Sequence, residues 1–150
     1  MSSRDRSPAA QRRAYFHLQI GAQRLRTTAD RLFVEEAGIT TAQAAVLMLV
    51  ADHAGCSQSL IANSLGQRES AVTAMIGRLQ AAELVERRPS RRDGRAWELW
   101  PTDSGAAALR RLEAALSTVN GYLDKAFGES GADEFVDTLQ RLTDLLDAGP

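Results

Sequence analysis

The feature that most constrains the fold is a pair of short segments, each with an apolar stripe, that are joined by a turn of about four residues around Gly66. Residues 58–65 and 69–82 carry apolar side chains at spacings of three and four, which predicts two helices. Ser57 is a favourable N-cap for the first helix, and Gly66 is typical of its end. Helices this short are not stable alone, so they must pack on a further helix. The pair therefore predicts a helix-turn-helix.

A third helix is predicted directly before this pair. Thr40 and Gln43 have the spacing of a capping box, and the helix should end near His53, with Gly55 just beyond. We expect it to support the helix-turn-helix through one apolar face. That face consists of Ala42, Ala45, Val46, Leu49 and Val50.

A β-hairpin is predicted over residues 84–100. Leu84 and Val85 begin an extended segment, Pro89 and Gly94 interrupt it, and residues 97–100 form the return strand. Five arginines lie within residues 87–95, so the hairpin loop is rich in arginine. Most charge runs are simply solvated surfaces, so this run has to be weighed with its neighbours.

Long amphipathic helices are predicted at both ends of the chain. One covers about residues 10–36, one begins after Thr102, and the last follows residues 128–131. Their apolar positions are Leu18, Leu25, Ala29, Leu32, Phe33, Leu109, Leu112, Leu116, Val119, Leu123, Phe135, Leu139, Leu142 and Leu146. A 150-residue monomer has little core to cover both ends. We therefore expect a two-fold homodimer, and a flexible tail at residues 1–8.

Composition narrows the class of protein. The chain is 44% hydrophobic, which excludes a disordered protein. The longest apolar run, residues 44–51, is too short to cross a membrane, and the charged N-terminus is unlike a secretory signal. A single cysteine excludes a disulfide framework and favours a cytoplasmic location.

Charge is distributed unevenly along the chain. Residues 68–95 hold seven arginines and four acids, whereas residues 101–150 hold nine acids and four bases. Seventeen of the eighteen basic residues are arginine, whose planar fork suits phosphate and base edges, although genomic composition could produce the same bias. The basic middle of the chain therefore indicates an anionic partner.

Four motifs together resemble the MarR (multiple antibiotic resistance regulator) family. They are AAVLMLVADHAGCSQSLIANSLG at 44–66, SAVTAMIGRLQAAELVERR at 70–88, RRDGRA at 91–96 and TDSG at 102–105. The resemblance covers about residues 12–147. It implies a mainly α fold of six helices with a small antiparallel β-hairpin. A winged helix-turn-helix lobe would occupy 39–102, and a helical dimerisation region 9–38 and 103–148.

The resemblance also implies a function. It suggests a homodimer that binds a pseudo-palindromic double-stranded DNA operator, usually to repress transcription, and that a small ligand or an oxidant releases. The helix at 69–82 would lie in the major groove, where we expect Arg68 to pair with a guanine edge and Arg78 to contact the backbone. Ser70 and Thr73 could bond a base or a phosphate, or be ordinary surface polarity. The candidates on this helix are Arg68, Ser70, Ala71, Thr73 and Arg78.

The arginine-rich loop would then be the wing, which lies along the minor groove. Arginine is attracted there by the negative potential of narrow A·T tracts. We expect Arg95 in the groove, oriented by Asp93, with Arg91 and Arg92 on phosphates. Glu69 departs from the family pattern by placing a negative charge at the groove-facing end of the helix, so base contacts are not carried over from relatives.

The expected inducer is a small phenolic or other aromatic molecule, bound between the dimer helices and the DNA-binding lobe. The candidate ligand residues are His17, Arg24, Met48 and His53, with Tyr15 and Phe16 as aromatic walls. Each has a plain structural alternative: Met48 suits a core, and His53 suits a helix C-terminus. Cys56 is better explained as a small buried hydrophobe than as a redox switch, because peroxide-sensing relatives carry their cysteine near the start of the first helix.

Two other classes of function remain. An enzyme would need a nucleophile–base constellation, which is absent from the sequence, and two histidines with one cysteine make a weak metal site. We expect no catalysis, cofactor or metal. An interaction module, whose wing binds an acidic protein, would differ from a DNA-binding protein by failing to bind duplexes directly.

Overall fold

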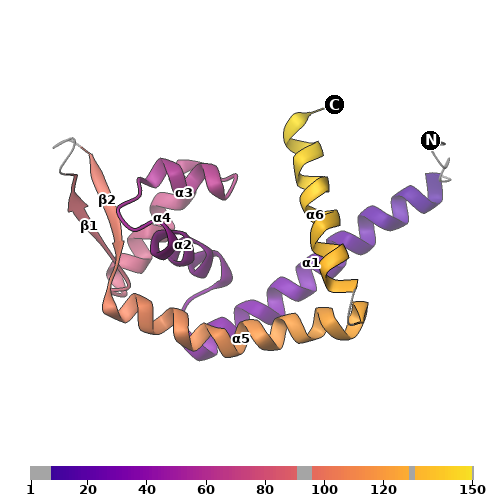
Figure 1. Ribbon diagram of the computed structural model, residues 1–150, viewed down its shortest axis with the longest axis horizontal. Helices are drawn as coiled ribbons and strands as arrows, with labels where there is room; N and C mark the ends of the chain where they lie inside the picture. The colour runs from indigo at the N-terminus through magenta and orange to yellow at the C-terminus, as the bar shows by residue number, and fades with distance from the viewer. Residues whose placement is uncertain (1–7, 91–95, 129–130, 150) are drawn as a thin grey trace. The chain divides into compact units, whose positions relative to one another are not determined.

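The computed structural model describes residues 8–90, 96–128 and 131–149, with side chains from residue 13 onward. Its elements are α1 (Pro8–Ala37), α2 (Thr41–Asp52), α3 (Gln58–Ser64), α4 (Glu69–Ala81), β1 (Val85–Pro89), β2 (Trp97–Pro101), α5 (Asp103–Phe127) and α6 (Gly131–Ala148) (Figure 1). This is the predicted mainly α fold with one small antiparallel hairpin. The first helix begins at Pro8, earlier than predicted and inside the expected tail, because proline suits the first position of a helix.

The chain divides into two compact units, Met1–Ala115 and Leu116–Pro150. The first unit holds α1 to α4, the hairpin and the first half of α5. The second holds the remainder of α5 together with α6.

Helix α2 lies at the centre of the first unit, in contact with α1, α3, α4 and β2. The predicted face of this helix was partly wrong. Its buried residues are Ala44, Val46, Leu47 and Val50. The other predicted residues, Ala42, Ala45 and Leu49, are only half-buried. Because almost every residue of α2 is apolar, spacing alone carried little information about which side faces the core.

Helix α4 buries the stripe that its spacing predicted. Val72, Met75, Ile76 and Leu79 are all buried. The helix ends in a Schellman motif, in which the amide of Leu84 donates to the carbonyl of Leu79 and the amide of Glu83 to that of Gln80, both at 2.9 Å.

Side chains cap the N-termini of three helices at the positions that the sequence predicted. Thr40 and Gln43 form the complete capping box of α2. The Ser57 hydroxyl accepts from the amide of Leu60 at 3.2 Å. At α5 the Thr102 hydroxyl accepts from the amide of Gly105 at 2.9 Å. These caps are local in sequence, which explains why they could be recognised without the fold.

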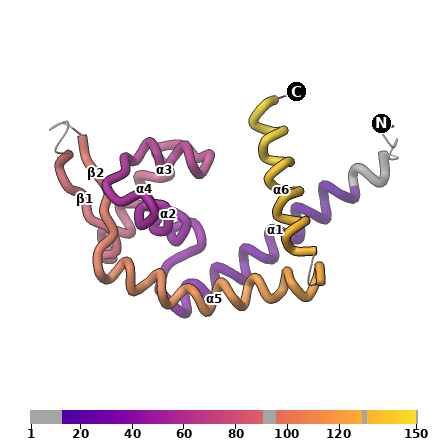
Figure 2. Tube along the Cα trace, in the orientation of Figure 1, coloured from indigo at the N-terminus to yellow at the C-terminus, as the bar shows by residue number. Residues whose placement is uncertain are grey.

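The hairpin pairs β1 with β2 from Val85↔Pro101 to Pro89↔Trp97. Figure 2 shows the two strands side by side next to α2, α3 and α4. Cys56 bridges the free edge of β2: the amide of Leu99 donates to its carbonyl at 2.9 Å. The segment between α2 and α3 therefore extends the sheet and ties the hairpin to the helix-turn-helix.

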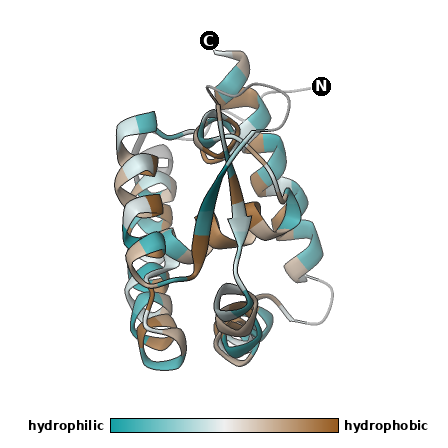
Figure 3. Cartoon of the chain, turned by 90° about the vertical axis from the view of Figure 1, so that its left-hand side faces the viewer, coloured by the Kyte–Doolittle hydropathy of each residue, from teal (hydrophilic) through white to brown (hydrophobic). Residues whose placement is uncertain are grey.

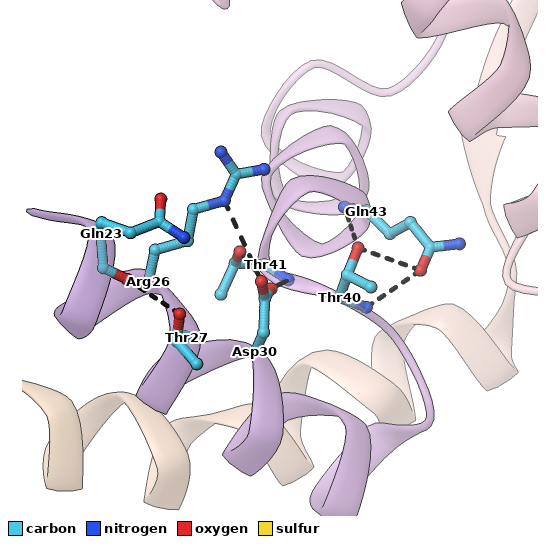
Figure 4. A network of polar contacts seen from close by, with 7 residues as sticks. All are labelled: Gln23, Arg26, Thr27, Asp30, Thr40, Thr41 and Gln43. Atoms are coloured by element: carbon cyan, nitrogen blue, oxygen red, sulfur yellow. Dashed lines mark hydrogen bonds and ion pairs between the residues drawn. The ribbon is translucent and has the colours of Figure 1, made fainter.

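A polar cluster joins α1 to the start of α2 (Figure 4). The carboxylate of Asp30 accepts from the amide of Thr41 at 2.8 Å and from its hydroxyl at 2.5 Å. Arg26 lies 4.0 Å from the other carboxylate oxygen. Further along, Arg111 of α5 donates to the carbonyl of Glu36 at 3.1 Å. Together these contacts hold the C-terminal half of α1 to the rest of the first unit.

The second unit has a sparse interior of its own. Phe127 and Phe135 stack with ring centroids 4.3 Å apart. Helix α6 buries no residue, and Leu145 and Leu146 are 71% and 72% exposed. Within the described ranges, no single helix is long and apolar enough to cross a membrane; α1 and α2 reach that composition only as a pair, bent by 64° where they meet.

Candidate nucleic-acid interface

The turn between α3 and α4 has the tight geometry that Gly66 predicted. Gly66 adopts φ +58°, and the amide of Gln67 returns to the carbonyl of Ala62 at 2.9 Å. Ile61 and Ala62 of α3 are buried together with the apolar stripe of α4. Because the apolar side of α4 is packed in the core, the opposite side of the helix is exposed to solvent.

The predicted contact residues of α4 all lie on this open side. Arg68, Ser70, Ala71, Thr73 and Arg78 are exposed. Arg68 stands at the N-cap position but makes no capping bond through its side chain. Its guanidinium is therefore available to an external acceptor, as a base- or phosphate-reading arginine requires.

Gln58, the first residue of α3, connects three elements and was missed by the sequence analysis. Its side-chain nitrogen Nε2 donates to the hydroxyl of Thr73 on α4 at 2.5 Å, and its side-chain oxygen Oε1 accepts from Arg87 on β1 at 3.2 Å. The Thr73 hydroxyl in turn donates to the carbonyl of Glu69 at 2.7 Å. Thr73 thus donates its hydroxyl hydrogen within the protein, and Gln58 links the exposed side of α4 to β1.

Ser59, the next residue of α3, was also missed. Its hydroxyl donates to a carboxylate oxygen of Glu69 at 2.6 Å. The only sequence signal for Gln58 and Ser59 is their place just after the N-cap Ser57. Their partners lie 10 to 29 residues away, so only folding brings them together.

The two arginines of β1 have different surroundings. Arg88 binds the carboxylate of Glu86 and lies 4.8 Å above the ring of Trp100. Arg87 contacts only the amide of Gln58 among the contacts described. Figure 3 shows hydrophilic residues along one strand of this hairpin. Arg88 therefore braces the hairpin, whereas Arg87 keeps most of its donors for an external group.

Trp100 is packed tightly against the segment that precedes α3. A Cβ on Gly55 would lie 3.0 Å from its indole ring, and Gly55 adopts φ +85°. The indole nitrogen is buried without a partner in the described part of the chain. The wing residues predicted at the hairpin tip, Arg91, Arg92, Asp93 and Arg95, lie outside the described residues.

The structure does not gather the predicted ligand residues around a described cavity. His17, Arg24 and His53 are exposed, and Met48 is half-buried. Tyr15 and Phe16 are 59% and 56% exposed and touch edge to face. These residues belong to the first unit, whereas a cavity of about 310 Å³ lies between α5 and α6 in the second.

Cys56 is buried, as its interpretation as a small hydrophobe requires. Burial raises the pKa of its thiol, which disfavours the reactive thiolate. Among the described side chains, no three His, Cys, Asp or Glu residues are grouped so that they could hold a metal ion.

Comparisons with known proteins agree with this geometry. The MarR family model matches residues 37–96. A protein of Thauera aromatica, provisionally named a transcriptional regulatory protein for the hcr operon, is 25% identical over 85% of this chain and 76% of its own length.

Solved structures match over most of the chain. The transcriptional repressor CouR, solved bound to a 23-mer DNA duplex, is 28% identical over 85% of this chain and 90% of its own, with a TM-score of 0.78. CouR has also been solved bound to p-coumaroyl-CoA, at 25% identity over 85% of this chain and 89% of its own, with a TM-score of 0.76. A MarR-family regulator of Rhodococcus sp. RHA1 is 20% identical over 91% of this chain and 97% of its own, with a TM-score of 0.80, which supports the fold.

Proposed function

We propose that the protein is a regulator of the MarR family, whose model matches residues 37–96, and that it is a dimeric, sequence-specific DNA-binding protein that represses transcription. The observation that carries this proposal is the exposed side of α4, which carries Arg68 and Arg78 and is linked through Gln58 to Arg87 of β1. A helix held this way, with arginines at its start and beside it, suits insertion into the major groove with flanking phosphate contacts. CouR, which is similar to this chain, is bound to a DNA duplex in a solved structure, and this supports DNA binding.

A second copy of the chain is the proposed partner for the exposed apolar residues of the terminal helices. On α1 these include Phe16 and Ile20, which are 56% and 52% exposed. On α6 they include Leu145 and Leu146. Apolar side chains in such numbers on helices of a small protein indicate an interface. Two-fold symmetry would present two copies of α4 to two half-sites of a pseudo-palindrome.

The test is selection of bound duplexes from a random pool at about physiological salt. We expect an enriched palindrome whose half-sites are about one helical turn apart. Arg68→Ala should lose affinity for that palindrome, whereas Arg110→Ala, an exposed arginine of α5, should not. Absence of any enriched sequence, with retention that depends only on salt, would overturn sequence-specific regulation and favour the interaction module.

Release by a small aromatic ligand is the second part of the proposal. CouR is bound to p-coumaroyl-CoA in one structure, which shows that a relative of this fold accepts an aromatic acyl ligand. His17 and Arg24 lie seven residues apart on α1 and so share one face, where a cation could meet an acidic group. Titrating hydroxycinnamic acids and their CoA thioesters into the protein–operator complex tests release. Such a regulator would act in the cytoplasm.

A further inference from the structure

We propose that Glu69 determines specificity by accepting a hydrogen bond from the N4 amino group of a cytosine in each operator half-site. Ser59 acts as its positioning residue. This inference rests on the proposed function, since it assigns a base to a residue of the helix placed in the major groove. It reverses the expectation that a negative charge at that end of α4 is only a departure from the family pattern.

The geometry of the carboxylate supports a role in recognition. Glu69 is the first residue of α4 and is exposed. The Ser59 hydroxyl holds its Oε1 at 2.6 Å, while its Oε2 makes no described hydrogen bond. A side chain fixed at one oxygen and open at the other loses less conformational entropy when it binds than a freely rotating glutamate would.

The neighbouring polar groups are already committed to one another. The Thr73 hydroxyl donates to the carbonyl of Glu69, and the Gln58 amide contacts Thr73 and Arg87. At the start of α4, the charged groups with capacity left for an external partner are the Glu69 carboxylate and the Arg68 guanidinium. The first only accepts hydrogen bonds and the second only donates them.

An acceptor and a donor at neighbouring positions match the cytosine and the guanine of G·C base pairs. In the major groove cytosine presents an N4 donor, whereas guanine presents two acceptors that would repel a carboxylate. Thymine also presents an acceptor. Arg68 suits guanine for the same reason that Glu69 excludes it. The adjacent pair Arg68–Glu69 therefore reads G·C-containing steps at the start of α4.

A carboxylate at this position also repels phosphate. The effect of removing it on specific and non-specific affinity distinguishes a base-reading Glu69 from one that is merely solvated. Removing a solvated charge should strengthen binding to every duplex by the same factor and leave the ratio of specific to non-specific affinity unchanged. Removing a base-reading charge should strengthen non-specific binding but lower that ratio. One good base contact corresponds to roughly five- to tenfold discrimination at the low end of its range.

The experiment compares wild type, Glu69→Gln, Glu69→Ala and Ser59→Ala by duplex selection and by Kd on the selected palindrome and on unrelated DNA. We expect Glu69→Gln to change the preferred base from cytosine to adenine, which a glutamine amide can bind. Glu69→Ala should relax that position, with a roughly five- to tenfold lower affinity ratio. Ser59→Ala keeps the charge, so it should keep cytosine but lower the ratio without strengthening non-specific binding.

Asp103→Asn is the matched control, because Asp103 is an exposed acid at the first position of α5. It should leave the selected sequence unchanged. If Glu69→Gln and Glu69→Ala both select the wild-type palindrome, with the same bases and the same affinity ratio, then the role of Glu69 is wrong while the proposed function stands. Failure of wild type to select any palindrome would overturn the proposed function, and this inference with it.

Discussion

Asp30 accepts two hydrogen bonds from Thr41, one from its amide and one from its hydroxyl, so one carboxylate anchors α1 to the first turn of α2. The hydrogen bond from the Thr41 side chain is the main cause that holds the pKa of Asp30 below its ordinary value, and Arg26 adds to it. Protonation of this group would therefore weaken the link between the two helices.

The lowered pKa of Asp30 predicts a pH dependence of stability. A carboxyl whose folded pKa lies below its unfolded pKa stabilises the fold above the unfolded value, about pH 4, and loses that contribution as pH falls through the folded pKa. Asp30→Asn should therefore unfold more easily than wild type at pH 7, and the difference should shrink as pH falls below about 4. Urea unfolding at fixed protein concentration measures it. Asp147→Asn, an exposed carboxylate of α6, should show no such trend.

A methyl group cannot be accommodated at Gly105. A Cβ there would lie 2.1 Å from the carbonyl oxygen of Leu84 and 3.3 Å from a methyl of Leu47. Gly105→Ala should therefore cost about 3 kcal/mol of unfolding free energy or more, as overpacking against backbone does. Gly77→Ala meets nothing within 4 Å in α4 and should gain about 1 kcal/mol from helix propensity. Equal midpoints for the two variants in chemical denaturation would contradict the close approach of α5 to the backbone of Leu84.

The different surroundings of Arg87 and Arg88 predict different salt dependences. If Arg87 contacts a phosphate, Arg87→Ala should reduce the slope of log K against log salt by about 0.9. Arg88→Ala should leave that slope nearly unchanged, because Glu86 and the ring of Trp100 already hold its guanidinium. Binding isotherms on one duplex at several salt concentrations give both slopes. If Arg88→Ala reduced the slope as much as Arg87→Ala, the two arginines would not have the different roles that we assign to them.

The exposed leucines of α6 predict how assembly can be broken. Leu145→Glu with Leu146→Glu places two charges where we propose that a second copy packs. Burying unpaired charges is costly, so the variant should sediment as a monomer and bind the palindrome more weakly than wild type. Gln140→Glu adds one charge at an exposed polar position of α6 and should remain dimeric. A double variant that sediments like wild type would place the dimer contact elsewhere.

The local features of the fold could be read from the sequence because their causes are local. Thr40 with Gln43, Ser57 and Thr102 lie within three residues of the amides that they cap, and Gly66 supplies the turn with its own backbone. In helix α4 the apolar residues recur at spacings of three and four among polar ones, so the spacing alone identified the buried side. The exposed side of α4, and with it Arg68 and Arg78, followed from the same pattern.

Other features depend on contacts between distant segments, and only the tertiary structure decided them. In α2 almost every residue is apolar, so its four packing neighbours, and not its periodicity, determine that Ala44 and Leu47 are buried. Gln58 and Ser59 resemble any polar pair at a helix start until α4 and β1 reach them. The same holds for Arg88, which has the charge of a DNA contact but is held by Glu86 and Trp100. Sequence thus determined what each helix is, whereas packing determined which of its side chains remain available to a partner.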